Sequence, residues 1–306
     1  MPFDFKIAGA TLLCLLACGL SAQAQTSDAD SYPPPVNLSQ QDFDGEALRD
    51  QPTFRQTLMA GVNLHYFDYL EKSAPPNRSS EKGALPGIDL SYEVQPYRGA
   101  WFVKINSTLT RASTQYDGTS FSLDQSGPVK PTTGTTSNRF IDARIVGGGQ
   151  LGEFAPYAGI GRTLWSRGNG EVVNGVISFP EDYSWFYAPV GIRWRHELGS
   201  SWRIGADASV QIMFGGQIEV DLSKRYVASS DGKGNLGSML GYRAEVPLEY
   251  MVWHGLGIAL APWFQYSAIG ESPAFALTVG GQDGMFVEPE SRTFQYGASL
   301  AAAAHF

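Results

Sequence analysis

The chain has 306 residues, of which 43% are hydrophobic and only 17% charged, with 35 glycines and 12% aromatic residues. This composition excludes both a disordered polyelectrolyte and a bundle of apolar membrane helices, and its aromatic and glycine content favours β-structure with many turns. The net charge is −8 at pH 7 and no basic run exists to follow a phosphate backbone, so we expect no nucleic acid among the partners.

The first 24 residues have the pattern of a secretory signal peptide. Lys6 precedes an almost wholly apolar stretch over residues 7–20, and Ala22-Gln23-Ala24 supplies the small-x-small pattern that signal peptidase cleaves. The apolar stretch is too short to span a membrane as a helix, and no run of about 18 apolar residues follows it. The sequence therefore predicts export of a mature chain.

Both cysteines of the chain, Cys14 and Cys18, lie inside the predicted signal. We therefore expect the exported protein to have neither a disulfide nor thiol chemistry. An alternative interpretation takes residues 15–18 as a lipoprotein cleavage site with Cys18 lipidated. Leu16 fits that pattern poorly, which favours the later cleavage site.

Residues 25–52 form a distinct segment between the signal and the rest of the chain. It contains three consecutive prolines at 33–35 and several acidic residues, with hardly any strand-forming residues. We expect an acidic, proline-rich periplasmic lead-in. The predicted domains are a signal peptide over 1–24, this lead-in over 25–52, and a strand-rich domain over 53–306.

Hydrophobic and polar residues alternate with period two from residue 53 onward, which is typical of strands whose two faces meet different surroundings. In the first strand Leu58, Val62 and Tyr66 share one face, and Asn63 and His65 share the other. About ten such segments occur, at residues 58–66, 88–95, 101–108, 142–145, 157–165, 186–195, 202–214, 240–250, 256–266 and 293–306.

One face of nearly every predicted strand is apolar or small, and the charges gather on the other face. A soluble barrel would seldom tolerate an outward apolar row as long as residues 202–214. Such a row is long enough to cross a hydrocarbon layer of ~25 Å. A large β-sandwich also buries one apolar face, so the periodicity alone leaves both architectures open.

Connection lengths distinguish these architectures, because short and long connections alternate strictly. Short ones lie near residues 96–99, 151–153, 198–201 and 253–255, and long polar ones at 71–84, 114–138, 166–182, 215–236 and 269–292. Aromatic residues gather at both ends of the apolar rows, as in the girdles of membrane barrels. The sequence predicts an all-β, transmembrane, antiparallel up-and-down β-barrel of about ten strands over residues 53–306, with periplasmic termini and five long extracellular loops.

The final strand resembles that of a known family. Residues 294–306 form one apolar row that ends on Phe306, similar to the terminal strand that the outer-membrane assembly machinery of Gram-negative bacteria recognises. The resemblance to Gram-negative outer-membrane β-barrels covers residues 53–306. It implies location in the cell outer membrane, with outer-membrane lipid, lipopolysaccharide and that machinery as partners, and it implies no activity.

Omptin proteases resemble the chain in strand number, but they require paired aspartates near the outer rim and an Asp-x-His pair on the facing wall. No Asp-x-His occurs here, and His196, His254 and His305 fall near the short-turn rim, which leaves only His65 toward the outside. The pattern of the outer-membrane phospholipase, a His followed at a distance by Ser-Asn, fails for the same lack of an outer-rim histidine.

His65 is a candidate for catalysis. If the first hairpin closes across residues 71–84, His65 lies opposite residue 90 or so, within reach of Asp89 and Ser91. A histidine flanked by a carboxylate and a hydroxyl can act as a base and nucleophile pair. Polar side chains in a narrow barrel must also bond one another, and no oxyanion-binding group is visible beside these three, so a structural role is favoured.

Charges of both signs, in similar number, are predicted to point into the barrel lumen. They are Glu93, Lys104, Asp142, Arg144, Arg193, Arg195, Asp207, Arg243, Glu245 and Glu249. Opposite charges in a low-dielectric lumen should bind one another and block the bore. A general diffusion porin is therefore not expected, and a narrow gated channel stays open as an alternative.

Neither glycine-containing segment predicts a cofactor or metal site. Residues 231–235 lack the acidic complement of a calcium loop, and residues 147–149 lack the helix that a phosphate cradle requires. We expect no cofactor, no metal and no enzymatic activity, and we interpret the chain as a structural, surface-interaction or ligand-binding protein that acts through extracellular loops. A membrane-embedded hydrolase that uses His65, Asp89 and Ser91 is the alternative.

Overall fold

The computed structural model describes residues 54–72, 79–96, 100–120, 130–168, 172–173, 176–177, 179–223 and 227–306. The predicted signal peptide, Cys14, Cys18 and the predicted lead-in lie outside these residues. All regular secondary structure in the described residues is β-strand, and they include no helix long and apolar enough to cross a membrane.

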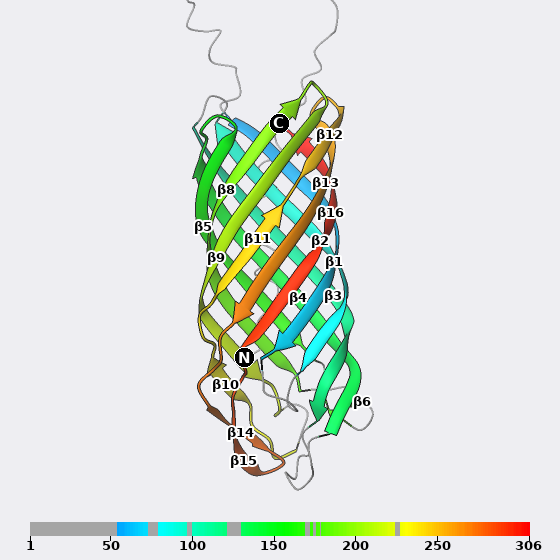
Figure 1. Cartoon of the computed structure of the whole chain (residues 1–306), viewed down its shortest axis with the longest axis vertical. Coiled ribbons are helices and arrows are strands. Elements are labelled where there is room, and N and C mark those ends of the chain that lie inside the picture. Colours follow the sequence, from blue (N-terminus) through cyan, green and yellow to red (C-terminus); the bar gives the residue numbers. More distant parts are fainter. Residues whose placement is uncertain are drawn as a thin grey trace, which may run out of the picture. The chain divides into compact units, whose positions relative to one another are not determined.

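Ten antiparallel strands close into a barrel (Figure 1). Nine of them are β1 (Phe54–Glu71), β2 (Ser80–Pro96), β3 (Trp101–Ser120), β4 (Lys130–Gly149), β5 (Phe154–Arg167), β8 (Glu181–Leu198), β9 (Trp202–Val220), β13 (Leu256–Ile269) and β16 (Ser291–His305). Consecutive barrel strands pair with each other, and β1 pairs with β16 to close the sheet. The predicted all-β barrel of about ten strands is confirmed.

The tenth barrel strand has two halves, β11 (Leu240–Glu245) and β12 (Leu248–Trp253). Both halves pair with β9 on one side and with β13 on the other. Val246 continues the ladder between them, because its N–H donates to the Pro262 carbonyl at 3.0 Å. Pro247 supplies no backbone N–H, which explains why the strand is divided at this point.

The two ends of the barrel carry different connections. At one end, called here the turn end, the links are residues 97–100, 150–153, 199–201 and 254–255. At the other, called the loop end, the connections carry the short strands β6 (Val172–Val173), β7 (Val176–Ile177), β10 (Gly232–Asn235), β14 (Phe275–Val279) and β15 (Gln282–Phe286). The β14–β15 hairpin extends beyond the loop end, at the bottom of Figure 1. The predicted alternation of short and long connections is confirmed.

Several strands extend further toward the loop end than the sequence predicts. The β2 strand begins at Ser80, inside the connection predicted over 71–84, and β3 and β4 remain paired as far as Ser120 and Lys130. The extensions of β3 and β4 are rich in threonine, a β-branched residue that favours strands. Because both of their faces are polar, no hydrophobic alternation marks them, and the predicted loop limits are wrong there.

Apolar side chains cover the outside of the barrel. Along β1, Val62 and Leu64 are 59% and 60% exposed, whereas Asn63 and His65 are 4% exposed. The other barrel strands show the same outward series, with exposed Ile88, Leu109, Ile145, Ile160, Val190, Ile212, Tyr242, Ile258 and Leu300. An exposed apolar band of this extent is unfavourable in water and favourable in a bilayer. The predicted outward orientation of the apolar rows is confirmed.

Candidate functional site

The lumen near the turn end holds a charge network around Glu93, called here the turn-end network. The Glu93 carboxylate accepts a hydrogen bond from Arg193 Nη1 at 3.0 Å and two from Arg195, at 2.9 and 2.7 Å. Lys104 lies directly opposite Glu93 in the β2–β3 register. Since Glu93 belongs to β2 and both arginines belong to β8, these bonds cross the lumen between opposite walls.

The other predicted lumen charges have mixed partners. The contacts are Arg243 with Glu245 (2.9 Å), Tyr157 with Asp207 (2.5 Å), Tyr187 with Asp142 (2.9 Å), Thr163 with Asp142 (2.7 Å) and His305 with Glu249 (2.5 Å). Arg144 lies opposite Asn106 in the β3–β4 register. Tyrosine and threonine hydroxyls, which the sequence pattern did not assign to the lumen network, therefore hold two of its carboxylates.

The predicted grouping of His65, Asp89 and Ser91 is wrong. His65 lies opposite Leu85, and Ser91 lies opposite Met59, which is six residues away from His65 along β1. The prediction placed His65 opposite residue 90 or so, because it assumed that the first connection extends to residue 84. The β2 strand begins earlier, at Ser80, and this shifts the register by about five positions.

His65 and Asp89 are nevertheless linked through Asn63. The Asn63 Nδ2 group lies 3.0 Å from Asp89 Oδ2, and Asn63 Oδ1 lies 2.8 Å from His65 Nδ1. Ser299 and Thr108 also donate to the Asp89 carboxylate, at 2.5 and 2.7 Å. Asp89 is thus held by three neutral donors, and Asn63 stands between it and the imidazole.

A cavity of about 50 Å³, called here the central cavity, lies beside His65. Its wall includes the polar side chains Thr110, Arg243 and Gln265 and the aromatic side chains of Trp263 and Trp165. The His65 and Trp263 rings are 5.0 Å apart between centres. The cavity is therefore lined by both polar and aromatic groups.

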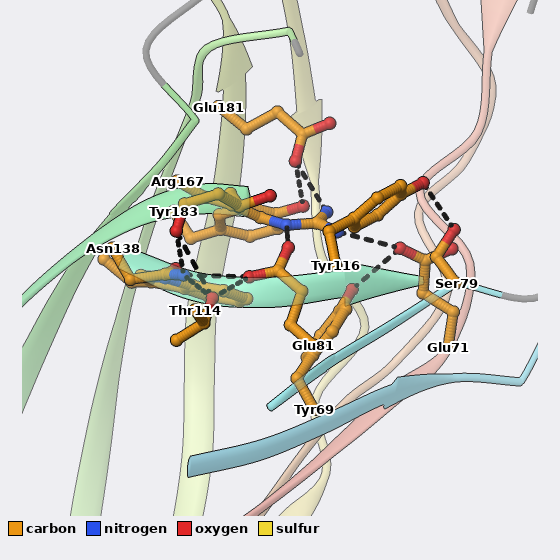
Figure 2. Close-up of polar contacts among 12 residues, drawn as sticks. Tyr69, Glu71, Ser79, Glu81, Thr114, Tyr116, Asn138, Arg167, Glu181 and Tyr183 are labelled. Atoms are coloured by element: carbon orange, nitrogen blue, oxygen red, sulfur yellow. Dashed lines mark hydrogen bonds and ion pairs between the residues drawn. The ribbon is translucent and has the colours of Figure 1, made fainter. Parts of the chain in front are cut away.

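A polar cluster that the sequence did not predict lies at the loop end and centres on Arg167 (Figure 2). We call it the loop-end cluster; it comprises Arg167, Glu71, Glu81, Glu181, Glu288, Tyr69 and Tyr183. Arg167 donates to Glu81 at 2.5 Å, to Glu181 at 2.8 Å and to Glu71 at 3.5 Å. These carboxylates belong to β2, β8 and β1, so one side chain on β5 ties together three other strands.

The loop-end cluster contains four carboxyl groups and a single guanidinium. Tyr183 Oη lies 3.0 Å from Glu181 Oε2 and 2.9 Å from Glu288 Oε1. A phenol has one proton, so both contacts are hydrogen bonds only if one of the two carboxyl groups is protonated. Burial, followed by the charges of Glu181 and Glu71, raises the pKa of Glu288 well above its usual range. Glu181 accepts a hydrogen bond from Arg167 at 2.8 Å, which favours its charged form, so we place this proton on Glu288.

Neighbouring side chains fix the cluster and separate it from the central cavity. Glu81 also accepts from Thr114 at 3.0 Å and from Asn138 at 2.8 Å. Trp165 donates to Asn138 Oδ1 at 2.6 Å, and its ring stacks on Tyr183 with 4.6 Å between centres. Trp165 lines the cavity as well, so its indole lies between the two sites.

The alternation of inward-facing and outward-facing residues along each strand was the signal that could have revealed the loop-end cluster. Glu71 continues the inward series of Asn63 and His65 on β1, and Glu81 continues the series of Glu93 on β2. Both residues lie in the segment that the sequence analysis interpreted as the first long loop. The pairing of Glu71 with Arg167 also depends on the barrel register, which no local pattern specifies.

No protein-family model and no curated protein matches the chain. Among solved structures, the outer membrane protease OmpT from Escherichia coli is similar, with a TM-score of 0.51 and 11% identity over 83% of this chain and 96% of that chain. The outer membrane protein OprG from Pseudomonas aeruginosa is also matched, with a TM-score of 0.35 and 10% identity over 82% of this chain and 95% of that chain. The attachment invasion locus protein Ail of Yersinia pestis is matched with a TM-score of 0.34 and 8% identity over 82% of this chain and 99% of that chain.

The likeness to OmpT shows the fold alone, which is that of outer-membrane β-barrels. At 11% identity it transfers no residue roles. In the described part of the chain, no group of three or more His, Cys, Asp or Glu side chains is arranged to hold a metal ion. Fold and interior together define an outer-membrane-type barrel whose lumen is crossed by bonded side chains.

Proposed function

We propose that the protein is a non-enzymatic barrel of the Gram-negative outer membrane that acts at the cell surface through its loop end. The observation that carries this proposal is the filled lumen. The turn-end network joins β2 to β8, and the loop-end cluster joins β5 to three other strands. Buried ion pairs that are bonded on several sides resist rearrangement, because a separated partner would be an unpaired buried charge.

The filled lumen argues against the alternative of a narrow channel. Between the two bonded layers the central cavity has a volume of only about 50 Å³. Trp165, buried at 1% exposure, closes this cavity toward the loop end. A transport role would require these layers to separate, whereas a role at the loop end uses the barrel as a rigid support.

The loop-end connections are anchored to the barrel, which suits a binding surface. Glu288 is 2% exposed and contacts Tyr183, so it fixes the connection before β16. Phe275 of β14 is buried and packs on Phe286 of β15, with 5.3 Å between ring centres. This aromatic pair therefore stabilises the hairpin, and we expect the polar and exposed parts of the connections to provide the contacts with an extracellular ligand.

We also propose lipopolysaccharide as a partner of the outer wall. Arg111 and Arg139 lie directly opposite each other on β3 and β4, next to the apolar residues Leu109 and Ile141. Guanidinium groups at the edge of the apolar band can donate paired hydrogen bonds to a lipid phosphate. The assembly machinery is the other proposed partner, through the exposed side chain of Phe306.

Cysteine accessibility on intact cells tests the proposed orientation. Cys14 and Cys18 are the chain's only cysteines. Met285 at the loop end and Leu151 at the turn end are both 68% exposed, so Met285→Cys and Leu151→Cys form a matched pair. A maleimide that does not cross membranes should label the first in intact cells and the second only after the outer membrane is permeabilised. The reverse pattern would overturn the proposal.

A further inference from the structure

Four residues that line the central cavity each have a buried polar atom with no hydrogen-bond partner among the described residues. These atoms are His65 Nε2, Thr110 Oγ1, Trp263 Nε1 and Arg243 Nε. Three of these side chains are more than nine-tenths buried, with exposures of 4% for His65, 1% for Thr110 and 7% for Trp263. An unpaired buried polar atom is destabilising, because it has lost its hydrogen bonds to water without replacement. Four such atoms around one cavity indicate a ligand that bonds them.

The hydrogen bonds around Asn63 determine which nitrogen of His65 carries the proton. The Asn63 amide nitrogen must face the Asp89 carboxylate, which only accepts hydrogen bonds, at 3.0 Å. The amide oxygen therefore faces His65 Nδ1, at 2.8 Å, and can only accept. In neutral His65 the proton is consequently on Nδ1, and Nε2, which has no partner among the described residues, carries the lone pair.

The four atoms require a ligand that both accepts and donates hydrogen bonds. Trp263 Nε1 and Arg243 Nε are donors, His65 Nε2 is an acceptor, and the Thr110 hydroxyl can serve as either. Arg243 is fixed in place, because its other two nitrogens donate to Gln265 at 3.0 Å and to Glu245 at 2.9 Å. Water meets these requirements, since it accepts two hydrogen bonds and donates two.

The surrounding strands keep the space for this ligand open. Gly297 lies between His65 and Trp263 in the barrel register. A Cβ atom at Gly297 would lie 2.2 Å from the Leu64 carbonyl oxygen and 2.5 Å from His65 Cβ, so only glycine allows β16 to pass this close to β1 beside His65. The cavity volume of about 50 Å³ exceeds the ~10–15 Å³ that a single water needs.

We propose that the central cavity is a water-binding acid–base site, in which bound water bridges His65, Thr110, Trp263 and Arg243 and His65 Nε2 is the proton acceptor. The Asn63 amide holds the imidazole in the tautomer whose Nε2 atom accepts a hydrogen bond, and Asp89 lies on the far side of Asn63. The site thus places a proton-exchanging group in the middle of a lumen that is otherwise closed by direct side-chain bonds. It is independent of the proposed role of the loops.

Water contact at two tryptophans tests this proposal. Trp263 lines the cavity and its Nε1 has no partner among the described residues, whereas Trp165 lines the same cavity but donates its indole proton to Asn138 at 2.6 Å. In the full chain, labelled with ¹⁵N at Trp and His and folded in micelles, a water-selective NOE should reach the Trp263 indole proton and be absent at Trp165. Trp263→Phe and Trp165→Phe assign the two signals.

A second measurement in the same sample reports the state of His65. Two-bond nitrogen–proton correlations should show neutral His65, assigned with His65→Gln, as the tautomer protonated on Nδ1. Thr110→Val, which removes one ligand of the water and keeps the side-chain shape, should reduce the Trp263 water signal at least twofold. A missing water signal at Trp263, an equal signal at Trp165, or a His65 protonated on Nε2 would overturn the proposal.

Discussion

A single proton on Glu288 determines how the connection before β16 binds to the barrel. The neutral carboxyl group allows Tyr183 to contact Glu181 and Glu288 at the same time, next to the carboxylate of Glu71. Ionisation of Glu288 would place another negative charge among carboxylates that share one guanidinium. The charge state of one residue is therefore coupled to the attachment of a whole connection.

This coupling predicts that the loop end loosens as the pH rises. Because the pKa of Glu288 is higher in the folded state than in the unfolded state, its stabilising contribution is complete below the ordinary glutamate pKa of about 4.3 and is lost as the pH rises through the raised value. Limited proteolysis of the 270–290 connection should accelerate with pH in the native chain. Glu288→Gln should reduce this pH dependence, because the amide cannot ionise.

Glu290→Gln is the matched control for that experiment. Glu290 lies in the same connection but forms an exposed ion pair with Lys72, and the Glu290 side chain is 33% exposed. Its substitution should leave the pH dependence of cleavage unchanged. Equal pH profiles for the native chain and Glu288→Gln would contradict the assignment of the proton.

Arg167 is predicted to contribute more to stability than any exposed arginine. Its side chain is 8% exposed and forms ion pairs with Glu71, Glu81 and Glu181. Arg167→Met should lower the free energy of unfolding by about 3–5 kcal/mol, because removal of one partner leaves buried charges unpaired. Denaturant titration of the barrel in detergent, followed by tryptophan fluorescence, measures this change.

Arg203→Met provides the comparison. Arg203 is 39% exposed and lies 3.5 and 3.6 Å from Glu197 and Glu249, so we expect its loss to cost at most about 1 kcal/mol. Similar losses for the two arginine variants would show that the loop-end cluster is a weak surface contact.

At the scale of the strand, the outward apolar rows are predicted to carry the interaction with lipid. Leu300 of β16 is 52% exposed on the outer wall. Leu300→Arg should reduce the stability of the barrel in lipid bilayers by about 2–4 kcal/mol, the cost of a cation near the bilayer midplane. Val227→Arg, in a connection and 94% exposed, should change it by less than about 0.5 kcal/mol. Equal effects would contradict the proposed membrane band.

Strand faces could be predicted from sequence, and strand register could not. The alternation of Val62 and Leu64 with Asn63 and His65 indicates which side of β1 meets lipid, because apolar and polar side chains alternate along the strand with period two. The pairing of His65 with Leu85 depends on the length of the first connection. That length is set by the polar start of β2 at Ser80, in which hydrophobicity does not alternate.

The candidate sites were harder to predict than the strands, because they join residues that are remote in sequence. Arg167 and Glu71 are 96 positions apart, and their contact exists only after the sheet has closed with its particular stagger. Asn63, which links His65 to Asp89, is visible in the sequence as an inward residue of β1. Its role depends on the β1–β2 register, and the predicted register was in error by about five positions.

At the scale of the whole molecule, the closed sheet predicts a compact species that survives detergent. Every barrel strand has two paired neighbours, so unfolding requires cooperative loss of many backbone bonds. Unboiled protein from the outer-membrane fraction should therefore migrate differently from boiled protein on a detergent gel. Identical migration of the two samples would contradict a stable barrel.

The bonded layers across the lumen predict that the intact barrel does not conduct ions. Purified protein in planar bilayers should show no steady single-channel steps, because Glu93 with Arg193 and the loop-end cluster occupy the bore. Steady single-channel current steps in the native chain would support the alternative that the protein is a narrow channel. Steps that appear only in Arg167→Met would indicate that the loop-end cluster is the seal.

The pairing of the first and last strands determines the order in which the molecule can be completed. The Gln56 and Phe306 backbones exchange hydrogen bonds of 3.0 and 2.9 Å, so the seam extends to residue 306. Until β16 has joined the sheet, β1 and β13 are edges with unpaired backbone groups, which are prone to associate with other chains. A chain that lacks β16 would therefore keep both edges exposed and would depend on a chaperone for protection.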